Sequence, residues 1–218
     1  MAEPERPVRL YLASTSPARL QTLRAAGIEP IAIAPGVDEA AAVAAAEAAS
    51  GPLGAPEMVQ LLARLKAEAV VGREHEGEPI DGLILGGDSA FLTGGAIHGK
   101  PHLPEVARER WLAQNGSHGD LWSGHWLIDH RGGRANGAVG RADVATVRFA
   151  ALDEAEIDAY IATGEPLEVA GAFTIDSKGA GFITGVEGDP HAVVGLSVPL
   201  VRTLVRRLGI EWTDLWNR

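Results

Sequence analysis

The fold is constrained most by an apolar run, a helix-start signal and a second apolar run that follow one another directly. Residues 8–13 are rich in apolar side chains and alternate in the manner of a strand. Ser16 is well placed as the N-cap of a following helix, Pro17 suits its first turn and Gly27 suits its C-terminal cap. Residues 30–34 form the second apolar run. This order predicts a β-α-β unit with parallel or neighbouring strands, and therefore an α/β fold.

The remainder of the chain continues to alternate helix patterns with strand patterns. Further helices are expected at 39–49, which is rich in alanine and should lie on the surface, and at 58–69, 104–114, 153–163 and 198–208. Strands are expected at 83–85, 121–129 and 143–149, with a glycine-rich connection at 132–140 and a hairpin of 90–93 with 96–98. No period repeats. The sequence therefore indicates a mixed sheet in a single domain over residues 1–218.

Composition restricts both the partners and the chemistry. The chain has 218 residues, no cysteine and a formal net charge of -10 at pH 7. The absence of cysteine excludes disulfides, thiolate metal sites and a cysteine nucleophile, and it suits a cytoplasmic location. No signal peptide or membrane span can be read near the N-terminus. The negative charge disfavours nucleic acid and anionic membrane as partners, so a phosphate ligand would need a local basic cluster or a divalent cation.

Three short stretches in the first part of the chain carry groups suited to phosphate chemistry. Ser14 offers a hydroxyl beside helix N-terminal amides, and Arg19 lies one turn inside that helix, although an ordinary N-cap explains the same residues. Asp38 and Glu39 place two carboxylates in a loop after a strand, where a metal ligand or a base is common, but acidic loops are frequent. Lys66 could bind a phosphate or face solvent like most helical lysines.

The segment 86–89 is more informative. Asp88 is expected just after strand 83–85, and a carboxylate at the carboxyl end of a buried strand often activates water or holds magnesium. Lys100 lies between glycine and proline and could reach a phosphate oxygen. A turn carboxylate and a surface lysine explain these residues equally well. The glycine-rich run 164–179 has little room to be core, so it is either a functional loop or a linker.

Several common site types are excluded by the sequence. Neither a Gly-x-Gly-x-x-Gly fingerprint nor a Gly-x-x-x-x-Gly-Lys-Ser/Thr P-loop is present. The run from Gly87 begins like a nucleophile elbow, but Phe91 stands where the second glycine is needed. His118 and His125 lack a His-Glu-x-x-His context, so we expect structural roles for them and no zinc site.

Taken together, these stretches resemble the Maf family of nucleoside triphosphate pyrophosphatases, also described as septum formation inhibitor-like proteins. The ordered motifs that carry the resemblance span nearly the whole chain, at 12–17, 37–39, 66–67, 87–89, 99–101, 165–173 and 193–196. The resemblance implies a Maf/ITPase-like fold, with an elongated, curved mixed β-sheet, flanking helices and two lobes around a central cleft. It also implies hydrolysis of (d)NTPs, including non-standard ones, between the α and β phosphates to a nucleoside monophosphate and pyrophosphate.

The resemblance further implies roles for single residues. The catalytic group would be Asp88 as general base or water-orienting carboxylate, together with Lys66 and Lys100. Substrate would be bound by Ser14, Arg19, Ser89 and Asp176. A magnesium or manganese ion would be placed by Asp38, Glu39 and Asp88. The partner would be a nucleoside triphosphate, and a homodimer is a plausible assembly.

Departures from the family's pattern keep other functions open. Ala18 stands where the family usually has an arginine, and Val169 stands where a lysine is common. A non-catalytic nucleotide-binding regulator of cell division is therefore the main alternative. Asp176 replaces a frequent glutamine and Ser89 a threonine, and the first of these leaves the nucleobase preference open. An unrelated α/β hydrolase or transferase with chance motif matches is the second alternative.

Overall fold

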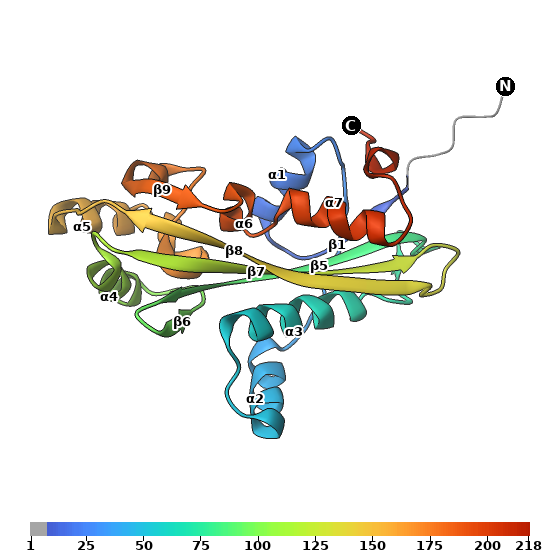
Figure 1. Cartoon of the computed structure of the whole chain (residues 1–218), viewed down its shortest axis with the longest axis horizontal. Coiled ribbons are helices and arrows are strands. Elements are labelled where there is room, and N and C mark those ends of the chain that lie inside the picture. Colours follow the sequence, from blue (N-terminus) through green and yellow to red (C-terminus); the bar gives the residue numbers. More distant parts are fainter. Residues whose placement is uncertain (1–7) are drawn as a thin grey trace. The chain divides into compact units, whose positions relative to one another are not determined.

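The computed structural model describes residues 8–218 and shows an α/β protein (Figure 1). Its α-helices are α1 Pro17–Ala25, α2 Glu39–Ser50, α3 Ala55–Glu68, α4 Pro104–Gln114, α5 Glu154–Ala162, α6 Pro190–Val194 and α7 Val198–Arg207. Its strands are β1 Leu10–Ala13, β2 Ile31–Ala32, β3 Glu74–His75, β4 Glu78–Pro79, β5 Gly82–Thr93, β6 Ala96–His98, β7 His118–His130, β8 Gly137–Phe149 and β9 Ile183–Glu187. Short 3-10 helices are η1 Glu165–Glu168, η2 Ala170–Ala172, η3 Lys178–Phe182 and η4 Trp212–Leu215. None of the helices in this part of the chain is long and apolar enough to cross a membrane.

The main sheet is mixed, as the sequence predicts. Over residues 8–218 it has seven strands in the order β2-β1-β5-β7-β8-β9, and β6 pairs with β5. Strand β1 runs parallel to both β2 and β5, whereas β6 and β9 are antiparallel to β5 and β8. Parallel strands need a crossover connection, and α1 lies in the crossover between β1 and β2. The predicted β-α-β unit is therefore confirmed.

The chain folds into two compact units, which are described separately. Of the described residues, the first unit contains those up to Asp88 together with Gly124–Ala142 and Val198–Arg218, and the second contains Ser89–Ser123 and Asp143–Ser197. Strands β5, β7 and β8 each contribute residues to both units. Within β5 the boundary falls between Asp88 and Ser89, so two neighbouring residues of one motif belong to different units.

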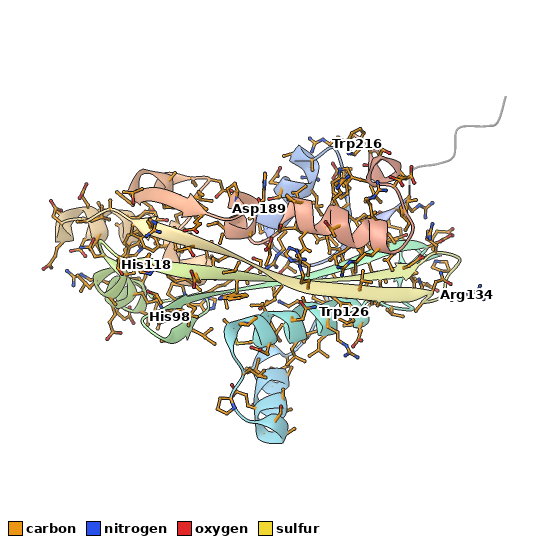
Figure 2. All side chains as sticks on the ribbon, viewed as in Figure 1. His98, His118, Trp126, Arg134, Asp189 and Trp216 are labelled. Atoms are coloured by element: carbon orange, nitrogen blue, oxygen red, sulfur yellow. The ribbon has the colours of Figure 1, made fainter. Side chains whose placement is uncertain are left out.

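In the first unit, helices cover both faces of the strands. Figure 1 shows α3 on one face and α1 and α7 on the other. A buried cluster is formed by Tyr11, Ala13, Ala67, Val70, Ile80, Ile84 and Ile128. Trp126 of β7 lies on the α3 side (Figure 2), and the Arg64 guanidinium lies 5.3 Å from the centroid of its ring. Burial on both faces explains why residues 83–85 form a continuous apolar run without alternation.

Strand β5 is much longer than the sequence predicts. It runs from Gly82 to Thr93, so Asp88 lies inside the strand and not at its carboxyl end. The glycines at 86 and 87 predict a strand end, but in the structure they allow helices to pack closely on the strand. A Cβ at Gly86 would lie 2.1 Å from the carbonyl oxygen of Ala63 in α3. The prediction was wrong because a glycine can mark a close backbone approach as well as a break.

An aromatic core fills the second unit. Edge-to-face ring pairs with centroids 5.0 to 5.9 Å apart join Phe91, Trp111, Phe149, Tyr160 and Phe173. Because Phe173 and Ala172 are buried here, the expectation that 164–179 has little room for core residues is wrong. Gly171 makes this possible: its φ is 75°, and a Cβ there would lie 2.7 Å from Phe91 Cγ. The glycine therefore lets the loop lie directly against an aromatic ring.

Most predicted helices and the predicted hairpin are confirmed. Helix α4 has the predicted bounds, α2 and α7 differ from prediction by one residue at one end, and α5 is shorter by one residue at each end. Asp153 caps α5 as expected and forms a capping box with Glu156. The β5–β6 hairpin turns at Gly94 and Gly95, which both have positive φ. These features depend on neighbouring residues, which is why the sequence could predict them.

Other element ends differ from prediction. Helix α3 begins at Ala55, earlier than expected, because Pro56 lies in its first turn and does not break it. Strand β2 spans only Ile31–Ala32, and a small β3–β4 hairpin fills part of the expected loop 73–81. Strand β8 begins within the expected glycine-rich connection. There a Cβ at Gly140 would lie 2.2 Å from Trp126 Cε3, so this glycine allows ring packing inside a strand.

Candidate active site

The turn between β1 and α1 contains a buried arginine. Ser16 caps α1 by accepting a hydrogen bond from the Arg19 amide. The Arg19 side chain turns inward, where its Nη1 donates to Ser14 Oγ at 3.1 Å, and both residues are buried. Burial lowers the pKa of Arg19, while the negative charges of Asp88 and Glu39 act to raise it. Ser14 and Arg19 are thus brought together within electrostatic reach of Asp88.

Lys66 joins two carboxylates from different segments of the first unit. Its Nζ lies 2.7 Å from Asp88 Oδ1 and 2.7 Å from Glu39 Oε1. Lys66 and Asp88 are each only 7% exposed, whereas the Glu39 side chain is half exposed. Lys66 lies on the buried face of α3, which also includes Ala55, Val59, Leu62, Ala63 and Ala67. The alternative that Lys66 is a solvated helical lysine is therefore wrong.

Asp88 is a buried carboxylate flanked by two cations. Burial raises its pKa, and the charges of Lys66 and Arg19 oppose that shift. The two cations favour the ionised form, while burial increases the affinity of the carboxylate for a proton. These are the properties required of a group that takes a proton from water. Since an ammonium has three donors, Lys66 can bind a phosphate oxygen while it keeps both carboxylates.

The carboxylate oxygens near Lys66 suit a hard divalent cation that is also bound by phosphate oxygens. Among residues 8–218, no three or more His, Cys, Asp or Glu side chains are placed to hold a metal ion alone. Magnesium commonly takes one or two protein carboxylates and completes its shell with phosphates and water. Asp88 and Glu39, which share one ammonium, fit that requirement. Asp38 fits less well, because its Oδ1 caps α2 by accepting from the Ala41 amide at 3.0 Å.

The other predicted site residues lie in the second unit. The Oγ of Ser89 is 3.0 Å from the Oγ of Ser123, which is a buried residue that the sequence did not indicate. Lys100 is exposed, and its Nζ lies 3.8 Å from Glu168 Oε2. Asp176 is exposed between η2 and η3. The substrate-binding and catalytic roles of these three predicted residues remain predictions.

Glu165 organises the loop that carries Asp176, a role the sequence analysis missed. The Glu165 carboxylate accepts hydrogen bonds from Tyr160 Oη, Thr174 Oγ1, Ser177 Oγ and the amides of Lys178 and Gly179. Burial alone would raise the pKa of Glu165, but the hydrogen bonds from the loop prevail and lower its pKa to about 2. Its place between glycine and proline was the available signal. The sequence could not show which donors converge on it.

Replacing Glu165 with glutamine is expected to lower the free energy of unfolding by about 1–3 kcal/mol at pH 7, because the amide leaves some of these donors unpaired. The pKa of Glu165 in the folded state, about 2, is below its ordinary value of 4.5. Its stabilisation is therefore complete above pH 4.5 and is lost as the pH falls towards 2. Urea denaturation at several pH values would measure this.

The exposed Glu168, on the same 3-10 helix, provides the matched control for Glu165. E168Q should change the free energy of unfolding by less than about 0.5 kcal/mol. The difference between wild type and E165Q should shrink on acidification. A difference that stays constant from neutral to acidic pH would contradict the role given to the Glu165 carboxylate.

Comparisons with known proteins show which family the chain resembles over most of its length. The family model described as "Maf-like protein" matches residues 9–208. A protein of Leifsonia xyli subsp. xyli, named nucleoside triphosphate pyrophosphatase, is 70% identical over 97% of this chain and 98% of its own length. Proteins of the same name from Salinispora tropica and Nocardia farcinica are 47% and 44% identical, over 97% and 95% of this chain and 89% and 96% of their own lengths. On this evidence the chain belongs to the Maf family.

Proposed function

We propose that this protein is a nucleoside triphosphate pyrophosphatase, which hydrolyses (d)NTPs between the α and β phosphates. The observation that supports this most is the buried ammonium of Lys66, which contacts Asp88 and Glu39 at 2.7 Å each. The three side chains together provide a candidate base, a cation that can bind phosphate, and two carboxylates that can bind a metal ion, all in one unit. The name shared by the relatives from Leifsonia xyli and Salinispora tropica supports the same activity.

In the proposed reaction, Asp88 orients a water molecule and accepts its proton as the water oxygen bonds to the α phosphorus. The bond from that phosphorus to the bridging oxygen breaks on the opposite side, and pyrophosphate leaves. Lys66 and Arg19 bind phosphate oxygens and offset the charge that develops on them. Because such a transfer depends mainly on positioning and charge neutralisation, it needs no covalent nucleophile.

Asp88 and Glu39 would hold a magnesium or manganese ion together with the substrate phosphates. Such an ion supplies further neutralisation of phosphate charge and helps to orient the phosphates. Ser14 accepts a hydrogen bond from Arg19 and so holds the guanidinium in place. For Lys100 we keep the role of a phosphate-binding cation, and for Asp176 that of a substrate contact. The variants K100A and D176A would examine each role separately.

The alternative of a non-catalytic regulator that binds a metal-free triphosphate is disfavoured by the position of Asp88. Such a protein gains nothing from a buried carboxylate near the cations, because the carboxylate repels the ligand. Burying it also has a desolvation cost. A base or metal ligand explains that cost, since both functions need the carboxylate.

A panel of standard and modified nucleoside triphosphates, incubated with magnesium or manganese, tests the proposed function. We expect release of pyrophosphate and a nucleoside monophosphate in equal amounts, and loss of turnover when EDTA removes the metal. The thermal midpoint should rise with bound nucleotide, since a ligand of the native state stabilises it. A regulator would show this rise without pyrophosphate release. An unrelated enzyme would show neither.

A further inference from the structure

A short chain of hydrogen bonds links β5, β7 and α6 within the second unit. Ser89 Oγ lies 3.0 Å from Ser123 Oγ, and Ser123 Oγ lies 2.9 Å from the carbonyl oxygen of Ala192. Ser123 is fully buried. Ala192 belongs to α6, whose N-cap, Asp189, is labelled in Figure 2. The residue after the candidate base is thereby connected to a distant part of the sequence.

The direction of this chain follows from the number of protons. A carbonyl oxygen cannot donate, so the single hydroxyl proton of Ser123 must point to Ala192. Ser123 can then only accept from Ser89, which must donate its own proton to Ser123. The carbonyl of Ala192 also accepts from the Gly195 amide at 3.0 Å, which occupies its second lone pair.

This direction limits what Ser89 can do for a substrate. Because its proton is already donated to Ser123, its hydroxyl has no proton left for a phosphate oxygen. Its side chain also points away from that of Asp88, since successive residues of a strand face opposite sides. Both observations argue against Ser89 as a phosphate ligand.

We propose that Ser89 and Ser123 form a positioning pair, which fixes the segment of β5 that immediately follows Asp88 and does not contact the substrate. This inference rests on the proposed pyrophosphatase activity and revises the substrate-binding role predicted for Ser89. Lys66 contacts the side chain of Asp88, and the next residue along the strand, Ser89, is hydrogen-bonded to Ser123. A displacement of the strand would misplace the carboxylate, and errors near 1 Å can reduce catalysis substantially.

Steady-state kinetics of pyrophosphate release tests the pair with S89A, S123A and the double variant. Each single variant should lower kcat by about tenfold to a hundredfold and leave KM within about twofold. The double variant should be no worse than either single variant, because both changes break the same chain. S89T keeps a hydroxyl and should resemble wild type. Valine has the same shape as threonine but no hydroxyl, so S89V should resemble S89A.

Several results would contradict the positioning role proposed for Ser89 and Ser123. One is a rise in KM at unchanged kcat for S89A with no effect of S123A, which would make Ser89 a direct substrate ligand. Equal kinetics of S89T and S89V would be another, and this comparison decides the matter if S123A fails to fold. If wild type releases no pyrophosphate, the proposed function fails separately. The thermal midpoints of the single and double variants then test the hydrogen bonds without turnover, and additive changes would refute them.

Discussion

Replacing Asp88 with asparagine should lower kcat for pyrophosphate release by about a hundredfold or more, because the amide cannot accept a proton from water. The change keeps the size of the side chain. It leaves Lys66 paired with the half-exposed Glu39, so the chain should still fold. A continuous pyrophosphate assay, with the thermal midpoint measured alongside, would separate loss of chemistry from loss of structure. Undiminished turnover by D88N would remove Asp88 from its role.

The pH dependence of wild-type activity provides a second test of Asp88 as the base. A base must be ionised to act, so activity should fall as the pH falls through the pKa of Asp88. Burial raises that pKa, so the fall should occur above the ordinary value of 3.8. D88N should lose this acid limb.

Asp129 offers a matched control in the same unit, since it is similarly buried and its Oδ2 pairs with Arg131 Nη2 at 2.8 Å. The predicted site does not include Asp129, so D129N should keep kcat within about twofold. A loss of turnover in D129N as large as that in D88N would mean that any buried aspartate of this unit is required, and the effect of D88N would not identify the base.

Replacing Lys66 with methionine is expected to combine a loss of stability with a loss of activity. Methionine preserves much of the apolar stem but leaves the buried Asp88 without its closest cation. Breaking a buried ion pair on one side costs about 3–5 kcal/mol when a charge stays buried without compensation, and the charge of Arg19 should offset part of that cost here. Loss of a phosphate-binding donor should also lower kcat/KM by about a hundredfold. Urea denaturation and steady-state kinetics would measure the two effects.

Two further variants isolate the role of the ammonium. R64M, on the same helix, removes a half-exposed cation that pairs with Glu68, so it should change the free energy of unfolding by about 1 kcal/mol or less. The double variant K66M/D88N removes the unpaired negative charge and should recover part of the stability lost in K66M, but no activity. If K66M were as stable as R64M, the contact between Lys66 and Asp88 would not be a buried ion pair in solution.

Features that depend on a few neighbouring residues were predictable. The Ser16 and Asp153 caps, the Gly94–Gly95 turn and the bounds of α4 all follow from residues that contact one another along the chain. The family resemblance also came from short ordered motifs, and the matched family supports it. The length of β5 could not be predicted from local signals. A glycine such as Gly86 can end a strand or can allow a helix to approach it closely, and which of these occurs depends on whether α3 packs there.

The candidate site shows the same division. Its residue types, in order, predicted phosphate chemistry, but Lys66 could equally have faced solvent. Ser123 and Glu165 gave little signal by themselves, since their importance lies in partners such as Ser89 and Thr174. A hydrogen bond between distant residues leaves no periodic pattern in the sequence.

The sequence by itself determined the α/β class, the succession of helices and strands, and the chemical groups available for phosphate chemistry. Only the tertiary structure decided that Asp88 lies within a strand, that Lys66 is buried against it, and that the hydroxyls of Ser89 and Ser123 form a hydrogen bond. The reason is physical. Local backbone preferences are set by neighbours in the chain, whereas burial and charge pairing depend on which distant segments meet.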